Sequence, residues 1–152
     1  MWKRKKKKVT PEPEQLETRS MTLDEVRKAV HAYADDMPDG VPLSVIINHD
    51  LTLDYDLLSP YLKGKPEETF YMSRETYELF EADNRELAVE LDMIQRAVDQ
   101  YMEQTGELPI IESDPYRRVN FFKLERLTLI PYRPEREYYV TQEEFLVTYK
   151  KN

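Results

Sequence analysis

The chain has no cysteine, only three glycines and only two histidines among its 152 residues. The lack of cysteine excludes disulfides, cysteine-ligated zinc, iron–sulfur clusters and thiol nucleophiles. The glycines, Gly40, Gly64 and Gly106, stand far apart at predicted chain breaks, so a glycine-rich phosphate loop is absent. Sequence patterns of zinc proteases, P-loop nucleotide binding and serine nucleophile elbows are also missing. The sequence therefore carries no signature of a common enzyme class, and we expect no cofactor and no metal.

Long apolar segments are also lacking. No run of eighteen apolar residues occurs, so we expect no transmembrane helix. The N-terminus is basic but lacks the apolar segment that a secretory signal needs. We therefore expect a cytoplasmic protein. Its hydrophobic content of 40% and its aromatic content of 11%, which includes eleven tyrosines, predict a packed interior rather than a disordered chain.

Charge is distributed unevenly along the chain, whose formal net charge is −8. Six basic residues stand together at the N-terminus: Lys3, Arg4, Lys5, Lys6, Lys7 and Lys8. Without them, 16 basic residues face 30 acidic ones, so the body has a net charge of about −14 and repels phosphates. We interpret residues 1–20 as a disordered, solubilising tail. The functional alternative is weak contact of this tail, with Trp2 as an interfacial anchor, with an anionic membrane or a nucleic acid.

One segment of the sequence occurs twice. Leu23–Tyr33, LDEVRKAVHAY, matches Leu91–Tyr101, LDMIQRAVDQY, at an offset of 68 positions. Residues 70–77 match residues 138–145 at the same offset. We interpret residues 21–84 and 85–152 as two diverged repeats that together form one compact domain.

Two long helices are predicted, one in each repeat. Thr22 and Glu25 fit a capping box, and apolar residues at spacings of three and four then continue to Met37. The same periodicity extends over residues 85–105 and ends at Gly106. Both patterns indicate amphipathic helices whose apolar faces contribute to the core.

Shorter apolar segments between turn residues predict strands. We expect strands at residues 41–47, 51–56, 69–72, 108–111, 119–124, 127–130 and 138–140. Short helices are expected to begin at Ser73 and Thr141, although residues 145–147 could instead continue as strand. Each repeat is then helix, hairpin, further strand and short helix. The fold class is α+β, with antiparallel sheets covered by helices about a pseudo-twofold axis.

The residues best suited to acid–base or metal chemistry have simpler explanations. His31 lies four positions before Asp35, as solvated helical pairs do, and His49 lies in a polar turn. The acidic pair at 67–68 follows a chain break, where solvation accounts for it. The acidic pair at 143–144 lies at the start of a predicted helix, where capping accounts for it. These residues therefore do not predict a catalytic or metal site.

Aromatic residues and arginines are the remaining signal. Several gather in the second repeat without counterparts in the first, and tyrosine and arginine commonly anchor protein interfaces. The candidate protein-binding face consists of Tyr116, Arg117, Arg118, Phe121, Tyr132 and Arg133. From this face we predict a non-enzymatic protein-binding or adaptor domain with an unidentified protein partner; a homodimer is also open. The alternative is a small-ligand-binding protein or enzyme with a carboxylate-lined cleft between the repeats.

Three segments resemble a known protein family. They read TFYMSRETYELF at 69–80, QRAVDQYMEQTGELP at 95–109 and YYVTQEEFLVT at 138–148. The resemblance covers residues 22–149 and is to an uncharacterised family of small proteins from Gram-positive, spore-forming bacteria. It implies a bacterial, cytoplasmic protein and supplies no catalytic residues.

Overall fold

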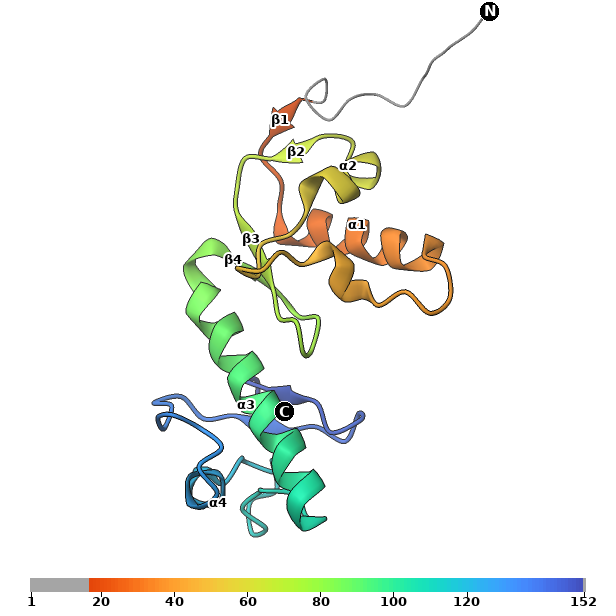
Figure 1. Cartoon of the computed structure of the whole chain (residues 1–152). Helices are drawn as coiled ribbons and strands as arrows, with labels where there is room; N and C mark the ends of the chain where they lie inside the picture. Colours follow the sequence, from red (N-terminus) through yellow and green to blue (C-terminus); the bar gives the residue numbers. More distant parts are fainter. Residues whose placement is uncertain (1–16, 152) are drawn as a thin grey trace, which may run out of the picture. The chain divides into compact units, whose positions relative to one another are not determined.

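A computed structural model describes residues 17–151, which divide into two compact units (Figure 1). Unit 1 comprises residues 17–72 and Leu79–Asp83, and unit 2 comprises Ser73–Glu78 and residues 84–151. The predicted tail contacts, Trp2 and residues 3–8, lie outside the described residues. No helix within residues 17–151 is long and apolar enough to cross a bilayer.

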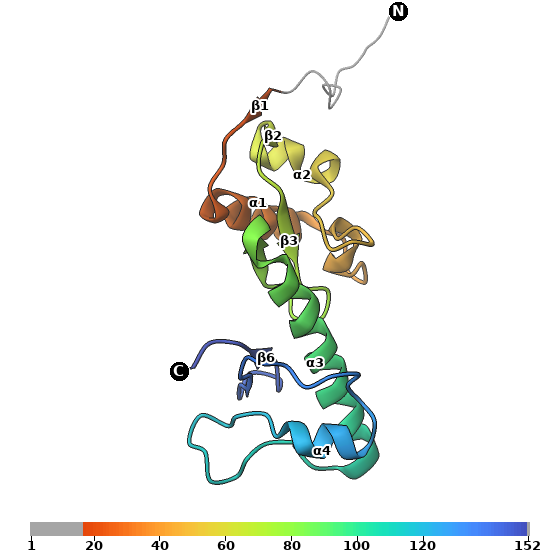
Figure 2. The ribbon, with the colours of Figure 1, turned by 90° about the vertical axis from the view of Figure 1, so that its left-hand side faces the viewer.

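Unit 1 is built on helix α1, Leu23–Asp36. The predicted capping box is confirmed: the Thr22 hydroxyl accepts the Glu25 amide proton, and the Glu25 carboxylate accepts the Thr22 amide proton. The buried face of α1 carries Val26, Ala29 and Val30. α1 packs beside helix α2, Tyr55–Leu62 (Figures 1 and 2).

The hairpin predicted between residues 41–47 and 51–56 is largely wrong. The first segment contains a 3₁₀ helix, η2, at Leu43–Ile46, and the pairing is reduced to one antiparallel bridge between Ile47 and Leu53. The second segment enters α2, because the Asp54 side chain accepts the Leu57 amide proton and starts a helix. The alternating pattern that we interpreted as a strand therefore includes a helix cap.

Short strand pairs complete unit 1. β1, Thr18–Arg19, pairs in parallel with β2, Lys65–Pro66, which the sequence did not predict. The predicted strand at 69–72 is confirmed as β3, Phe70–Met72, and it pairs antiparallel with β4, Leu79–Glu81. A short 3₁₀ helix, η3, follows at Ala82–Asn84.

The short helix expected at Ser73 is wrong. Residues 73–78 instead form the hairpin loop between β3 and β4, closed by the Ser73 amide donating to the Glu78 carbonyl. Tyr77 has a left-handed backbone with φ 63°, which a right-handed helix cannot contain.

Unit 2 is built on helix α3, Arg85–Thr105, which confirms the longest predicted helix. Gly106 adopts φ 74° and caps its C-terminus, as glycine does most readily. The buried face of α3 includes Leu91, Ile94 and Val98, each fully buried. This face organises the core of unit 2.

The strands predicted at 119–124 and 127–130 are wrong. Helix α4, Phe121–Arg126, replaces the first, because the Asn120 side chain accepts the amide protons of Phe122 and Lys123 and caps a helical turn. Residues 127–130 form no strand. The strand expected at 108–111 is reduced to a bridge between Ile110 and Val119.

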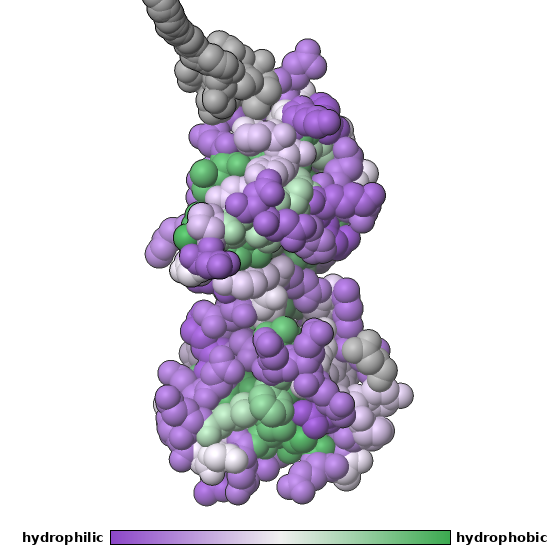
Figure 3. Space-filling view, turned by 90° about the vertical axis from the view of Figure 1, so that its right-hand side faces the viewer, coloured by the Kyte–Doolittle hydropathy of each residue, from purple (hydrophilic) through white to green (hydrophobic). Residues whose placement is uncertain are grey.

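A second hairpin ends unit 2. β5, Tyr139–Val140, pairs antiparallel with β6, Val147–Thr148. The helix expected at Thr141 is wrong, because Glu144 and Phe145 have φ 56° and 60° and form a hairpin loop instead. The structure confirms an α+β class, with small strand pairs in place of large sheets. Hydrophilic residues cover most of the face in Figure 3, with an apolar patch within unit 2.

Candidate functional site

The six residues of the predicted face are distributed over unit 2 rather than brought into one hollow. Tyr132 and Arg133 line a depression of about 490 Å³ that we call the acidic hollow. Tyr116 and Arg117 line a second, smaller depression of about 180 Å³ that we call the basic hollow. Arg118 and Phe121 line neither. The acidic hollow is lined by Glu86, Leu87, Glu90, Tyr132, Arg133, Glu135 and Arg136.

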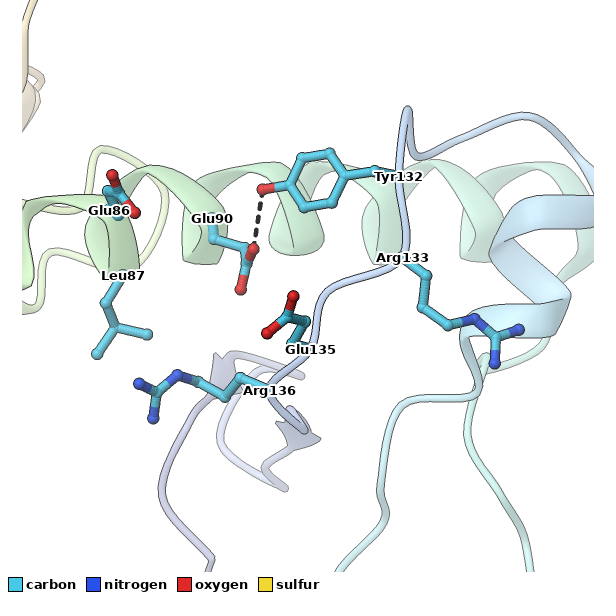
Figure 4. Close-up of a pocket in the computed structure, with 7 residues that line it drawn as sticks. All are labelled: Glu86, Leu87, Glu90, Tyr132, Arg133, Glu135 and Arg136. Atoms are coloured by element: carbon cyan, nitrogen blue, oxygen red, sulfur yellow. Dashed lines mark hydrogen bonds between the residues drawn. The ribbon is translucent and has the colours of Figure 1, made fainter.

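Helix α3 and the segment before β5 form the two sides of the acidic hollow (Figure 4). Glu86 and Glu90 are one turn apart on α3, so both carboxylates lie on one side of the helix. Tyr132 and Glu135 come from the opposite segment, and the Tyr132 ring extends toward Glu90. The hollow is therefore bordered by carboxylates from two different parts of unit 2.

Two tyrosine hydroxyls fix the Glu90 carboxylate. Tyr132 donates to one Glu90 oxygen at 2.8 Å, and Tyr138 donates to the other at 2.7 Å. Partial burial and the hydrogen bond to Glu90 raise the pKa of Tyr132 to about 12. Burial, with the same carboxylate as the next cause, raises the pKa of Tyr138 further. Both tyrosines therefore stay protonated donors at neutral pH.

The acidic hollow has more carboxylates than arginines facing it: Glu86, Glu90 and Glu135 line it, and of its two arginines Arg136 stays in the lining. Arg133 directs its guanidinium away from the hollow, where it pairs with Glu125, and this pairing lowers the pKa of Glu125 (Figure 4). Glu86 and Glu135 have no hydrogen bond or ion pair within residues 17–151. The hollow thus keeps carboxylates that are free to contact a cation.

The basic hollow lies where a turn meets the hairpin of β5 and β6. Its walls are Pro115, Tyr116, Arg117, Tyr139, Val140, Thr141, Gln142, Thr148 and Lys150, with no carboxylate among them. The half-exposed Tyr116 ring meets the Tyr139 ring edge-to-face, with centroids 6.5 Å apart. This small hollow is therefore cationic and partly aromatic in a chain that is acidic overall.

Arg118 and Phe121 have structural surroundings. Arg118 pairs with Glu137 at 2.5 Å and with Asp114 at 3.2 Å, and the Glu137 hydrogen bond raises the pKa of the guanidinium. Phe121 begins α4 and is half-buried. Neither residue extends the two hollows, so the predicted face contains residues of different character.

Sequence patterns missed two buried polar residues of α3. Asp92 accepts from the Ser73 hydroxyl at 2.5 Å and from the amides of Arg74 and Glu75, and so holds the first hairpin loop. Gln95 accepts the Val147 amide proton at 2.6 Å. Both residues lie beside the apolar positions of the helix. A polar residue there could have indicated a buried hydrogen-bond partner, because buried polar groups are hydrogen-bonded.

Metal-binding groups do not assemble in the described chain. Within residues 17–151, no three or more histidine or acidic side chains are grouped to hold an ion. His31 and His49 are exposed, in keeping with the solvated roles that the sequence suggested.

No curated protein and no solved structure matches the chain significantly. A family model does match: residues 16–149 fit the family described as a protein of unknown function, DUF3939. Because the match covers most of the chain, this protein belongs to that family of unknown function.

Proposed function

We propose that this chain is a non-enzymatic protein-binding domain, and that the acidic hollow of unit 2 receives a basic side chain of its partner. The observation that carries this proposal is the pair of unpartnered carboxylates, Glu86 and Glu135, beside the exposed Tyr132 ring. A tyrosine edge next to unpaired carboxylates is well suited to a lysine or arginine side chain, since its aliphatic stem packs on the ring while its charge meets the acids.

The size of the acidic hollow agrees with such an occupant. Its volume of about 490 Å³ lies within the range of about 300–1,000 Å³ that ligand pockets span. Because Tyr132 and Tyr138 already donate to Glu90, this carboxylate is held in place rather than available as a mobile proton carrier. The arrangement favours recognition over acid–base catalysis.

A small cationic ligand is the second candidate, because the same carboxylates would bind a free amine or guanidine. The sequence suggested a carboxylate-lined cleft between the repeats, whereas the small-ligand site proposed here lies within unit 2. A peptide and a small amine are distinguished by their affinities: a protein-binding surface gains from contacts outside the hollow, whereas a small-ligand site does not.

Titration of the isotope-labelled protein with acetylated, amidated tetralysine tests the proposal by NMR. We expect saturable shifts at Glu86, Tyr132 and Glu135. The double variant Glu86→Gln, Glu135→Gln should weaken binding at least about fivefold, since charge-assisted contacts are lost. Stronger binding of butylamine than of the peptide would favour the small-ligand candidate.

The matched control is the double variant Glu103→Gln, Glu107→Gln. It removes the same charge from exposed positions of unit 2 outside the hollow. Equal weakening in both double variants would mean that net charge alone attracts the peptide, and the proposed hollow would be rejected.

We further propose that residues 21–84 and residues 85–152 are diverged repeats, as the sequence suggests. Both hairpin loops are closed alike: the Ser73 amide donates to the Glu78 carbonyl, and the Thr141 amide donates to the Leu146 carbonyl, each at 2.8 Å. Tyr77 and Phe145, at the offset of the repeat, both have left-handed backbones. The predicted pseudo-twofold axis stays a prediction.

The short helices support the same proposal. Asp54 caps α2 and Asn120 caps α4, and the fourth residue after each cap, Leu58 or Leu124, is fully buried. At the offset of 68 positions, Leu23 at the start of α1 corresponds to Leu91, whereas α3 already begins at Arg85. That extra N-terminal part carries Glu86 and Glu90, so the acidic hollow belongs to the second copy alone.

A further inference from the structure

We propose that the basic hollow of unit 2 binds a single oxyanion group, a carboxylate or a phosphate, carried on a partner molecule. Arg117 is the main contact, and Lys150 and the Tyr116 ring complete the site. This site is separate from the acidic hollow and has the opposite charge preference.

The Arg117 side chain is held in position before any ligand arrives. Its Nε donates to the Val140 carbonyl at 2.9 Å, and the Val140 amide donates to the Arg117 carbonyl at 3.0 Å. The turn starting at Asp114 fixes the backbone, because the Arg117 amide donates to the Asp114 carbonyl. A guanidinium anchored through Nε keeps its outer nitrogens in a fixed orientation.

The outer nitrogens of Arg117 remain available. They have no hydrogen-bond or ion-pair partner within residues 17–151. Arg118 and Arg133, by contrast, already pair with Glu137 and Glu125. Two parallel N–H groups of a guanidinium match the two oxygens of a carboxylate or phosphate, so Arg117 is prepared to bind an outside anion.

The surrounding charges favour an anion as well. Lys150 lines the hollow, and Lys151 lies over the Tyr116 ring, 4.6 Å from its centroid. Lys150 also forms a long ion pair with Glu78, with 3.6 Å between Nζ and the carboxylate oxygen, so Arg117 is the main cation of the site. The nearby Asp114 carboxylate is occupied by Arg118 and by the Tyr116 amide, so its charge is largely neutralised.

The alignment of the two units gives an independent contrast. Leu51 and Arg117 correspond, because each has a left-handed backbone and a carbonyl that accepts the amide proton of the neighbouring strand, from Met72 or Val140. Leu51 is buried, whereas Arg117 is half-buried and cationic. At this position the first unit has a buried core leucine, whereas the second unit has a partly exposed guanidinium.

The size of the hollow limits the ligand. Its volume of about 180 Å³ is below the range of about 300–1,000 Å³ for pockets that enclose a drug-sized molecule. A single anionic group fits, and the exposed Tyr116 ring offers a surface for the group that carries it. The carrier would then be a side chain of a peptide rather than a nucleotide enclosed by the site.

NMR titration with O-phosphotyrosine and with N-acetylaspartate, at constant ionic strength, tests this site and identifies the oxyanion. We expect saturable shifts of the amides of Tyr116, Arg117, Val140 and Lys150. Binding of phosphotyrosine alone would assign a phosphate, and binding of both would assign a general oxyanion site.

Arg117→Gly removes the guanidinium while glycine readily adopts the φ of 60° at this position. We expect affinity to fall about tenfold or more, since a charge-assisted bidentate contact is lost. Arg117→Asn also tolerates this backbone and serves as a second variant if the glycine variant is unstable. Arg126→Ala, which removes the same charge from α4, should bind as the wild type does.

Two results would overturn the proposal. One is the absence of saturable shifts with either probe. The other is an equal loss of affinity in Arg117→Gly and Arg126→Ala, which would reduce the effect to net charge. Neither result depends on the tetralysine experiment, so this site and the acidic hollow can fail separately.

Discussion

At the scale of single residues, Asp92 shows how a buried carboxylate organises a loop. It is only 4% exposed, and both of its oxygens accept hydrogen bonds from residues 73–75. The neighbouring Glu75 carboxyl has its pKa raised, mainly by burial and also by the Asp92 charge. The loop therefore depends on one acceptor that contacts it from α3.

Asp92→Asn should destabilise the protein by about 1–3 kcal/mol, because an amide donor would face amide protons that now have an acceptor. Urea denaturation followed by circular dichroism measures the change. The control is Asp35→Asn, an exposed aspartate of α1, for which we expect a change below about 0.5 kcal/mol. Equal effects of the two substitutions would contradict the assigned role of Asp92.

Glu68 gives a prediction about pH. The Ser20 hydroxyl and the Met21 amide donate to its carboxylate and hold the Glu68 pKa below its usual value of 4.5. A lowered folded pKa stabilises the fold above about pH 4.5, and this contribution is lost as the pH falls through the folded pKa. The stability difference between wild type and Glu68→Gln should therefore shrink on acidification below pH 4.5. A difference that grows on acidification would contradict this sign.

At the scale of elements, two of the helices, α2 and α3, are capped by a residue whose backbone is left-handed. α2 ends at Lys63 with φ 57°, and α3 ends at Gly106 with φ 74°. A side chain is strained in this conformation, whereas glycine is not. The two helix ends should therefore respond in opposite directions to the exchange of glycine with a larger residue.

Gly106→Ala should destabilise the protein by about 1 kcal/mol, and Lys63→Gly should stabilise it by a few tenths of a kcal/mol up to about 1 kcal/mol. Thermal denaturation measures both changes. Gly106→Asn is the matched control and should cost less than Gly106→Ala, because asparagine tolerates the left-handed region. The opposite order of the two Gly106 variants would show that backbone strain is not the cause.

At the scale of the whole molecule, the N-terminal segment and the rest of the chain carry charge of opposite sign. Residues 3–8 are all basic, whereas the rest of the chain has a net charge of about −14. Near a negatively charged surface each basic residue contributes roughly 1 kcal/mol of attraction, while the acidic body is repelled. We propose that contact with anionic lipid rests on this segment.

Deletion of Met1–Lys8 should abolish sedimentation with vesicles that contain phosphatidylserine. The wild type should bind these vesicles weakly, and its binding should fall as salt is raised, because screening shortens the electrostatic range. Neutral phosphatidylcholine vesicles are the control and should retain neither protein. Unchanged binding after the deletion would sink the assignment of the contact to the tail.

The sequence by itself determined the long helices, because their signals are local. The capping box of Thr22 and Glu25 marks the start of α1, and Gly106 marks the end of α3. Each signal, like the apolar spacing, acts within a single helix, so both helices were found from the sequence. β3 and β5 were also found, since their aromatic and β-branched residues favour strands.

The tertiary structure decided the rest, because short elements depend on contacts that are distant in sequence. Ser73 and Thr141 resemble helix caps, yet the carbonyls of Glu78 and Leu146 close hairpin loops there. Asn120 starts a helix where apolar residues suggested a strand. The candidate sites were decided in the same way: Glu90 is fixed only when Tyr132 and Tyr138 reach it across the fold. No local pattern records which side chains meet in space, and that is why the sequence identified tyrosines and arginines but not the two hollows that they line.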